Sequence, residues 1–421
     1  MKKGFSLLHL MLLILISLIL IRFDRISEIS NQLASWIGLL FTDFNSAWSQ
    51  LNLSLFDDFM SIIILLHVIV ITLLFKNNKL FNTKITLLGG SLILLTAAIL
   101  FAPLISNQNP NFFTDVGTTK LLPPMSSKKV FSTTECTSHN FNPGRCKKCG
   151  LSINNENNMV FADSCYLSGT NFCFFQKGTK KTLPLASIIT SENKPIVKNA
   201  HFILGTDQFG RDVFSRVLYG ARVSILIGIL ATLISLTLGI SLGFWAGFSN
   251  SRVSIVLTRI NETFLLFPMI FLAIMILMFF GSNFLSIVLV LGLSGWMGLF
   301  KIVKEEVIKI KSKDYFLSSK ALGIPKRDLL FIDILPVIAV PITVNTLFQF
   351  GNVIIAESAL SFLGLSLSSD FPSWGTMIEN GQEYIRHAWW LVTFPSLALV
   401  LTLLLSNNFA QFINKKLDPR I

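Results

Sequence analysis

Long apolar runs separated by short polar segments dominate this sequence. A helix needs about 20 predominantly apolar residues to cross the roughly 30 Å hydrocarbon core of a membrane. The runs that approach or exceed this length without Asp, Glu, Lys or Arg are Gly4–Ile21, Phe59–Phe75, Ile85–Ile105, Val223–Ser251, Thr263–Phe300, Ile334–Ala356 and Ala388–Asn414. We therefore expect each of these runs to span a membrane as helix.

The run Thr263–Phe300 is too long for a single crossing. Gly281-Ser282-Asn283 interrupts it, and these residue types favour turns. We expect a hairpin of two helices here, which brings the total to about eight. Of the 421 residues, 52% are hydrophobic and 14% are charged, whereas about a quarter of an ordinary soluble chain is charged. This balance excludes a soluble globular enzyme and a disordered chain.

The distribution of charge predicts the orientation in the membrane. The net charge is +12, and short loops rich in Lys and Arg stay cytoplasmic. Lys2 and Lys3 place the N-terminus inside. The basic segment 301–327 places the long loop that contains it inside, and Lys415 and Lys416 do the same for the C-terminus. We expect a multi-pass protein of the bacterial cytoplasmic (inner) membrane, with both termini cytoplasmic and no nucleic-acid partner.

Two parts of the chain leave alternatives open under this topology. Residues 106–200 fall outside although they carry several Lys residues, which is tolerated because long translocated segments escape the charge rule. The first run resembles a signal peptide in its first two regions, but no small-x-small cleavage site follows it. An uncleaved anchor is therefore favoured over a cleaved leader.

All five cysteines lie in residues 106–200. Cys136-x2-His139 and Cys146-x2-Cys149 form two close pairs of soft ligands, a spacing that suits one tetrahedral zinc ion. Cys165 and Cys173 would then form a hairpin disulfide. The alternative is a disulfide pattern with one spare thiol, which an oxidising compartment favours. Both interpretations make the cysteines structural.

Two polar segments stand out against the apolar background. The first precedes a membrane-spanning run and carries Gly205, Thr206, Asp207, Gly210, Arg211, Asp212 and Arg222. By itself this segment suits an interfacial anchor. The second lies in the basic loop, where Gly323 can end one short helix in the left-handed conformation and Pro325 can begin another. The loop is thus predicted to be a helix-turn-helix.

These segments resemble the permease subunits of ABC importers for peptides and nickel, specifically the second permease of the oligopeptide/dipeptide pair. The resemblance covers about Ile85–Ile421. It rests on Leu204–Asp212, on the loop with Gly323 and the distant Leu335-Pro336, and on Ala356–Leu365, Pro372–Gly375 and Asp418–Arg420. The sequence departs from the family at Leu317-Ser318-Ser319, where Glu-Ala-Ala is usual, and at Ile332-Asp333 and Ala410-Gln411.

The resemblance implies an all-α integral membrane protein with the transmembrane fold of a type I ABC importer and a small extracytoplasmic insertion. It also implies that a coupling helix contacts a cytoplasmic ATPase through Asp314, Tyr315, Ser318, Ser319, Ala321, Leu322, Gly323, Pro325 and Lys326. No Gly-x4-Gly-Lys-Ser/Thr loop occurs, so ATP would bind partner subunits and this chain would not be an enzyme. The implied partners are a second permease, two ATPase subunits, an extracytoplasmic substrate-binding protein and membrane lipid.

The same comparison divides the chain into four parts. They are an N-terminal extension with two additional spans (1–80), a first core span (81–105), the cysteine-bearing insertion (106–200), and the permease core (201–421) with its coupling loop at about 301–333. The implied function is ATP-driven peptide import by alternating access. A nickel or metal-chelate permease and a membrane-anchored sensor or scaffold are the alternatives.

Three patterns inside the predicted spans concern packing and the transport path. Gly239, Gly243 and Gly247 recur at every fourth position, which allows a neighbouring helix to approach closely. Asn345, Gln349 and Asn352 share one helical face, which we expect to point inward because polar groups are costly against lipid. That face either lines the substrate path or forms hydrogen bonds to a neighbouring helix. The same two roles are open for Glu357.

Overall fold

The computed structural model describes residues 7–42, 61, 65, 87–106, 110, 116–133, 159–168, 171–191, 194–325, 328–365 and 372–417. Its longer α-helices are α1 (Leu7–Thr42), α4 (Leu87–Leu100), α7 (Val213–Phe248), α8 (Ser251–Leu266), α9 (Met269–Phe280), α10 (Phe284–Lys311), α13 (Leu335–Phe362) and α15 (Trp390–Leu417). The shorter ones are α5 (Ala102–Ile105), α6 (Val116–Thr119), α11 (Asp314–Ala321) and α14 (Trp374–Gly381), together with a π-helical turn at Leu329–Ile334 and 3-10 turns at Leu185–Ser187 and Gln382–Tyr384.

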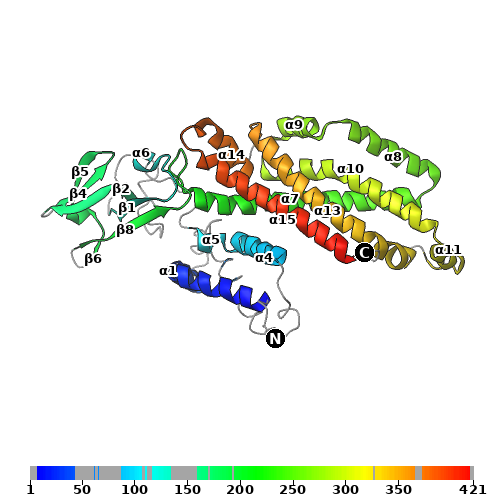
Figure 1. The fold of residues 1–421 in the computed structure, drawn as a ribbon, viewed down its shortest axis with the longest axis horizontal. Helices are drawn as coiled ribbons and strands as arrows, with labels where there is room; N and C mark the ends of the chain where they lie inside the picture. Colours follow the sequence, from blue (N-terminus) through cyan, green and yellow to red (C-terminus); the bar gives the residue numbers. More distant parts are fainter. Residues whose placement is uncertain are drawn as a thin grey trace.

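The strands are β1 (Ser126–Ser132), β2 (Met159–Ala162), β3 (Ser164–Ser168), β4 (Asn171–Gln176), β5 (Thr179–Pro184), β6 (Thr190–Ser191), β7 (Lys194–Pro195) and β8 (Val197–Phe202). Figure 1 shows an elongated helical bundle with these strands gathered at one end and α11 at the other. We call the strand-bearing part, residues 116–202, the lobe.

The predicted helical membrane fold is confirmed for the core of the chain. In the described residues, α7, α10, α13 and α15 are long and apolar enough to cross a membrane, and α8 with α9 adds a fifth candidate bent by 86°. Of the remaining expected spans, Gly4–Ile21 falls mainly within α1, which kinks at Arg22, and Ile85–Ile105 is divided between α4 and α5. The run Phe59–Phe75 lies outside the described residues except for Ser61 and Leu65.

The predicted break after α9 is confirmed. Gly281 ends α9 with a left-handed φ of +77°, and the side chain of Asn283 caps α10 by accepting from the Ser286 amide (2.9 Å). The boundary at Thr263 is wrong, because the chain is already helical from Ser251 in α8 and bends only at Pro268. Proline has no amide hydrogen and cannot continue the backbone hydrogen bonds of α8, so the helix ends there.

The glycine ridge packs α7 against α10, as predicted. A Cβ at Gly239 would lie 2.6 Å from Cβ of Leu299, and a Cβ at Gly243 would lie 2.8 Å from Cβ of Val303. Both separations are shorter than a carbon–carbon contact allows, so the two helices approach closely only because these side chains are absent. The α7–α10 pair is the stem of the bundle.

The small insertion that was expected beside the all-α core folds as β-sheet, which the sequence analysis did not predict. One sheet has the order β2-β1-β8 and a second has the order β3-β4-β5, each with antiparallel neighbours. Phe131, Phe172 and Phe174 form an aromatic core, with ring centroids 4.8 and 5.1 Å apart for the two pairs that include Phe131. The lobe therefore has a hydrophobic core of its own.

The predicted Cys165–Cys173 disulfide is wrong. In the β3–β4 register, Cys165 lies opposite Phe174 and Cys173 lies opposite Tyr166. Because alternate residues of a strand face opposite sides of the sheet, the two sulfurs point to different faces, and both are free thiols. Cys136, His139, Cys146 and Cys149 lie outside the described residues, and their zinc site stays a prediction.

Candidate functional site: the α11 knob and the outer end of the bundle

The short helix α11 ends as the sequence predicts. The Gly323 amide donates to the Lys320 carbonyl (3.1 Å) and the Ile324 amide donates to the Ser319 carbonyl (3.3 Å). This pair of bonds is a Schellman motif, and it requires the left-handed φ of +77° at Gly323. The Pro325 carbonyl then accepts from the amides of Asp328 and Leu329, starting the next helical segment. We call residues 312–325 the α11 knob.

Phe316 anchors the knob to the bundle and is a residue that the sequence analysis missed. Its side chain is 3% exposed and packs in a cluster with Val303 and Val307 of α10 and with Ile334 and Ile338. Phe316 is the middle residue of the apolar run Tyr315-Phe316-Leu317, and the sequence alone does not show which of the three is buried. Because the anchor reaches the same valines that meet the glycine ridge, the knob is continuous with the α7–α10 stem.

The outer surface of the knob presents apolar side chains to solvent. Tyr315, Leu317 and Leu322 are 46%, 50% and 81% exposed. Of the predicted contact residues, Asp314, Ser318, Ala321, Gly323 and Pro325 are also exposed, Ser319 is half-buried, and Lys326 lies outside the described residues. An exposed apolar tip on a rigid stem is suited to insertion into a groove of another protein.

A lysine fixes the stem next to the knob. Lys311 Nζ donates to the Gly247 carbonyl (2.9 Å) and lies 5.6 Å from the centroid of the Phe248 ring. An ammonium group at the end of α7 suits the partial negative charge of a helix C-terminus. The ends of α7 and α10 are thus tied together where the knob begins.

The polar face predicted on α13 is only partly buried. Asn345 and Gln349 are half-buried, whereas Asn352 is exposed. A Cβ at Gly295 of α10 would lie 2.1 Å from Gln349 Nε2, so this amide fills the space above the glycine. Gln349 thus packs against α10, and whether any of the three lines the transport path stays a prediction.

Glu357 is buried in contact with neighbouring helices, and its role in the transport path stays a prediction. It is 0% exposed. Its Oε1 accepts from Ser361 Oγ (3.1 Å) and its Oε2 accepts from Ser224 Oγ (3.4 Å). Ser224 Oγ also accepts from the Trp374 amide (3.2 Å), so the carboxylate joins α13 to α7 at the start of α14. Ser361 lies one helical turn from Glu357, but sequence spacing could not reveal the contact with Ser224, which is far away in the chain.

The motif at the start of α7, residues 205–222, forms a buried ionic turn. Asp207 Oδ1 accepts from the amides of Phe209 and Arg211 (both 2.9 Å), and Oδ2 accepts from Arg211 Nε (2.7 Å). Arg216 Nε lies 3.8 Å from the same oxygen. All three charged side chains are at most 6% exposed. Gly210 closes the turn with a φ of +77°.

The same motif joins the lobe to the membrane helices. Thr206 Oγ1 accepts from the Leu122 amide (2.8 Å) and donates to the Thr119 carbonyl, while the Thr206 carbonyl accepts from Trp390 Nε1 (3.2 Å). Gly205 is left-handed (φ +81°), and a Cβ there would lie 2.5 Å from the Leu122 carbonyl oxygen. The lobe, α7 and α15 therefore meet at these two residues.

Asp212 and Arg222 complete the junction. Asp212 caps α7 by accepting from the amide (3.1 Å) and hydroxyl (2.6 Å) of Ser215. Burial raises the pKa of Asp212, against the effect of these hydrogen bonds. Arg222 Nε donates to the Ile99 carbonyl (2.6 Å) at the end of α4, where a cation is favourable. This motif thus has a structural role that its interfacial position alone does not reveal.

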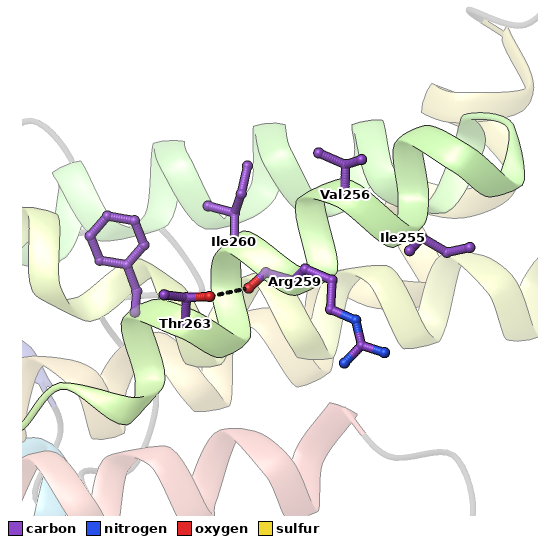
Figure 2. Close-up of a pocket in the computed structure, with 6 residues that line it drawn as sticks. Ile255, Val256, Arg259, Ile260 and Thr263 are labelled. Carbon is purple, nitrogen blue, oxygen red and sulfur yellow. Dashed lines mark hydrogen bonds between the residues drawn. The ribbon is translucent and has the colours of Figure 1, made fainter.

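Figure 2 shows side chains of α8 that line a shallow hollow. It is lined by Ile255, Val256, Arg259, Ile260, Thr263 and Phe264, all from this one helix. Thr263 Oγ1 donates to the Arg259 carbonyl within the helix (2.8 Å). Among the residues that the structure describes, no second helix or strand lines this hollow.

Comparison with known proteins identifies the family. The profile described as "Binding-protein-dependent transport system inner membrane component" matches residues 239–421. The di/tripeptide transport system permease protein DppC of Pseudomonas aeruginosa is 34% identical over 222 residues, which cover 53% of this chain and 73% of that protein. This chain belongs to that family of ABC permeases. The dipeptide permease DppC of Bacillus subtilis is also 34% identical, over 234 residues covering 55% and 72% of the two chains.

Another relative of this permease is the oligopeptide permease OppC of Haemophilus influenzae, 31% identical over 226 residues that cover 54% of this chain and 72% of that protein. A crystal structure of an amino acid ABC transporter is 17% identical with a TM-score of 0.39, covering 48% of this chain and 95% of that one. The profile match begins within α7 and includes the α11 knob, α13 and α14 of the permease. The lobe and α1 precede it.

Proposed function

We propose that this chain is the permease subunit of an ATP-driven importer that moves di- and oligopeptides across the cytoplasmic membrane by alternating access. The relatives at 30–34% identity include proteins named as dipeptide, di/tripeptide and oligopeptide permeases, which favours peptides over a nickel chelate. The sequence has no phosphate-binding loop of its own. Energy must therefore come from ATPase subunits bound to the permease.

The observation that carries this proposal is the exposed α11 knob on the α7–α10 stem. Phe316 fixes the knob to α10, so a push or pull on the knob is transmitted to the helices that cross the membrane. Rigid-body motion of such packed helices is the usual means of alternating access. In the proposed assembly, two ATPase subunits dock on the knobs of two paired permeases, and a substrate-binding protein delivers peptide from outside.

Replacing the apolar tip of the knob tests this coupling. Leu322 is 81% exposed, so Leu322→Asp should leave the fold intact. The new charge should prevent the tip from entering an apolar groove of the ATPase, so ATPase binding should fail. We expect at least a tenfold loss of ATP-dependent uptake of labelled dipeptide into vesicles that contain the full assembly. ATPase should also fail to co-purify with the variant.

Leu363→Asp is the matched control. Leu363 also caps a helix, is 55% exposed, and precedes a left-handed glycine, Gly364 (φ +79°). It lies at the opposite end of α13 from the knob, so ATPase should remain bound. Equal ATPase retention by the two variants would defeat the coupling proposal.

The proposed orientation puts the knob and the C-terminus inside and the lobe outside. Figure 1 places α11 at one end of the bundle and the lobe at the other, with α15 running from the side of the lobe toward α11. In a cysteine-free background, Lys177→Cys should react with a membrane-impermeant thiol reagent in intact spheroplasts, and Leu322→Cys only after lysis. The reverse pattern would invert the topology.

A further inference from the structure

The lobe carries an excess of positive charge that the transport core does not require. Its described residues include eight Lys, no Arg, no Glu and a single Asp, Asp163. Residues 106–200 as a whole contain eleven basic and five acidic residues, which gives a net charge of +6. This charge lies on the side opposite the α11 knob, which is the outer side in the proposed orientation. The enrichment of Lys and Arg in cytoplasmic loops therefore does not explain it.

The lysines concentrate on the hairpin formed by β4 and β5. Lys177, Lys180 and Lys181 are exposed, and the only ion pair among the described residues of the lobe joins Lys128 to Asp163. In the register, Lys180 lies opposite Phe175 and Lys181 opposite Phe174, so the two ammonium groups project from opposite faces of the hairpin. Together with Lys177 at the turn, they give the end of the hairpin three positive charges, none of which has an ion-pair partner among the described residues.

The turn of this hairpin is held in one conformation. Lys177 and Gly178 have φ values of +49° and +78°, the pattern of a tight type I′ turn. A left-handed lysine is unfavourable and needs support from its surroundings. Asp163 gives this support: its Oδ2 accepts from the Lys177 amide (2.9 Å). The Lys128 ammonium, by hydrogen bonding to this carboxylate, lowers the pKa of Asp163 and keeps it charged.

One more contact orders a charged side chain. Lys180 Nζ lies 5.4 Å from the centroid of the Tyr166 ring, which is itself 44% exposed. This cation–π contact favours one position of the Lys180 side chain. The hairpin therefore presents its charges from a defined frame, which a merely solvated lysine-rich loop would not do.

The position of the hairpin decides between a lipid and a protein partner. Figure 1 shows β4 and β5 at the far end of the lobe, whereas β8 leads back to the start of α7. The candidate spans α7 and α15 begin at Val213 and Trp390, so the outer lipid headgroups are expected near this end of the bundle. A hairpin that points away from the headgroups is placed to contact soluble molecules on the outer side of the membrane.

We propose that the β4–β5 hairpin is a docking finger for an acidic face of the soluble substrate-binding protein. This inference rests on the proposed function, because that function requires such a protein to meet the permease on the side of the lobe. Complementary charge raises the rate of encounter and orients the partner before close contact is made. The finger would thus act chiefly on association and leave the transport step to the bundle.

The test compares two pairs of neutralised lysines in the complete assembly, reconstituted in nanodiscs of neutral lipid. One variant combines Lys180→Gln with Lys181→Gln and keeps the turn at Lys177 intact. The control combines Lys120→Gln with Lys198→Gln, which removes the same charge from exposed positions elsewhere on the lobe. We expect about a tenfold lower association rate of the binding protein for the hairpin variant at low salt, and less than about a twofold change for the control. High salt should remove the difference.

Equal effects of the two variants, or no effect of either, would overturn the docking finger. Binding of the wild-type assembly to anionic phosphatidylglycerol vesicles, lost in the hairpin variant without any binding protein present, would overturn the partner and assign the finger to lipid. Peptide uptake distinguishes failure of this inference from failure of the proposed function on which it rests. Wild-type assemblies that take up no peptide refute the proposed function, whereas normal uptake with an unchanged half-saturating concentration of binding protein in the hairpin variant refutes only the finger.

Discussion

Asp207→Asn is expected to destabilise the permease by about 3–5 kcal/mol, because it leaves two buried guanidinium groups without their carboxylate. Asn keeps an oxygen that can accept from the Phe209 and Arg211 amides, so the loop hydrogen bonds survive. What is lost is the charge that faces Arg211 and Arg216, both of which are nearly inaccessible. Equilibrium unfolding in mixed micelles measures the change, and the junction between the lobe, α7 and α15 should separate first.

Asp163→Asn supplies the comparison. It also neutralises an aspartate of an ion pair while keeping an acceptor for a backbone amide, but the pair with Lys128 is much more exposed. Exposed pairs contribute about 0–1 kcal/mol, since water and salt screen them. Similar losses of stability in the two variants would show that the Asp207 cluster is not the ionic junction described above.

Gly243→Ala is expected to force α7 and α10 apart. Its new Cβ would lie 2.8 Å from Cβ of Val303 and 2.9 Å from the Phe300 carbonyl oxygen, and the backbone atom cannot move out of the way by changing rotamer. Overpacking of this kind costs about 1–3 kcal/mol. Because these helices form the stem of the knob, the variant should also lose ATP-dependent uptake even where it still folds. Unfolding in micelles and uptake into vesicles measure the two effects.

Gly298→Ala on α10 should behave in the opposite way. No atom lies within 4 Å of a Cβ built there, and alanine is a better helix former than glycine by about 1 kcal/mol. We expect this variant to be as stable as the parent or slightly more stable, with normal uptake. A loss at Gly298 equal to that at Gly243 would mean that the damage comes from glycine replacement in general and not from the α7–α10 contact.

Local patterns predicted the features that depend on neighbouring residues in the chain. The break at Gly281, the cap at Gly323 and the start at Pro325 follow from backbone preferences, which act over a few residues. The glycine ridge was also readable, because a helical repeat of four places Gly239, Gly243 and Gly247 on one side whatever the partner is. The departure at Leu317-Ser318-Ser319 did not disturb the helix.

Features assembled from distant segments were not readable. The serines around Glu357 come from α7 and α13, and the Thr206–Trp390 bond spans most of the core. Phe316 looked like any apolar residue until its packing against α10 was visible. The cysteine pairing failed for a similar reason: Cys165 and Cys173 are near enough in sequence, but the strand register assigns them to opposite faces.

The sequence by itself determined that this is a helical membrane protein of the importer type, with a helix-turn-helix knob in its basic loop. Those properties follow from hydropathy, turn residues and short motifs, each of which acts locally. The tertiary structure decided that the insertion is a β-lobe with its own aromatic core, that Asp207 ties it to the bundle, and where its lysines gather. Strand register and buried ion pairs depend on which distant segments meet, and that is decided only when the chain packs.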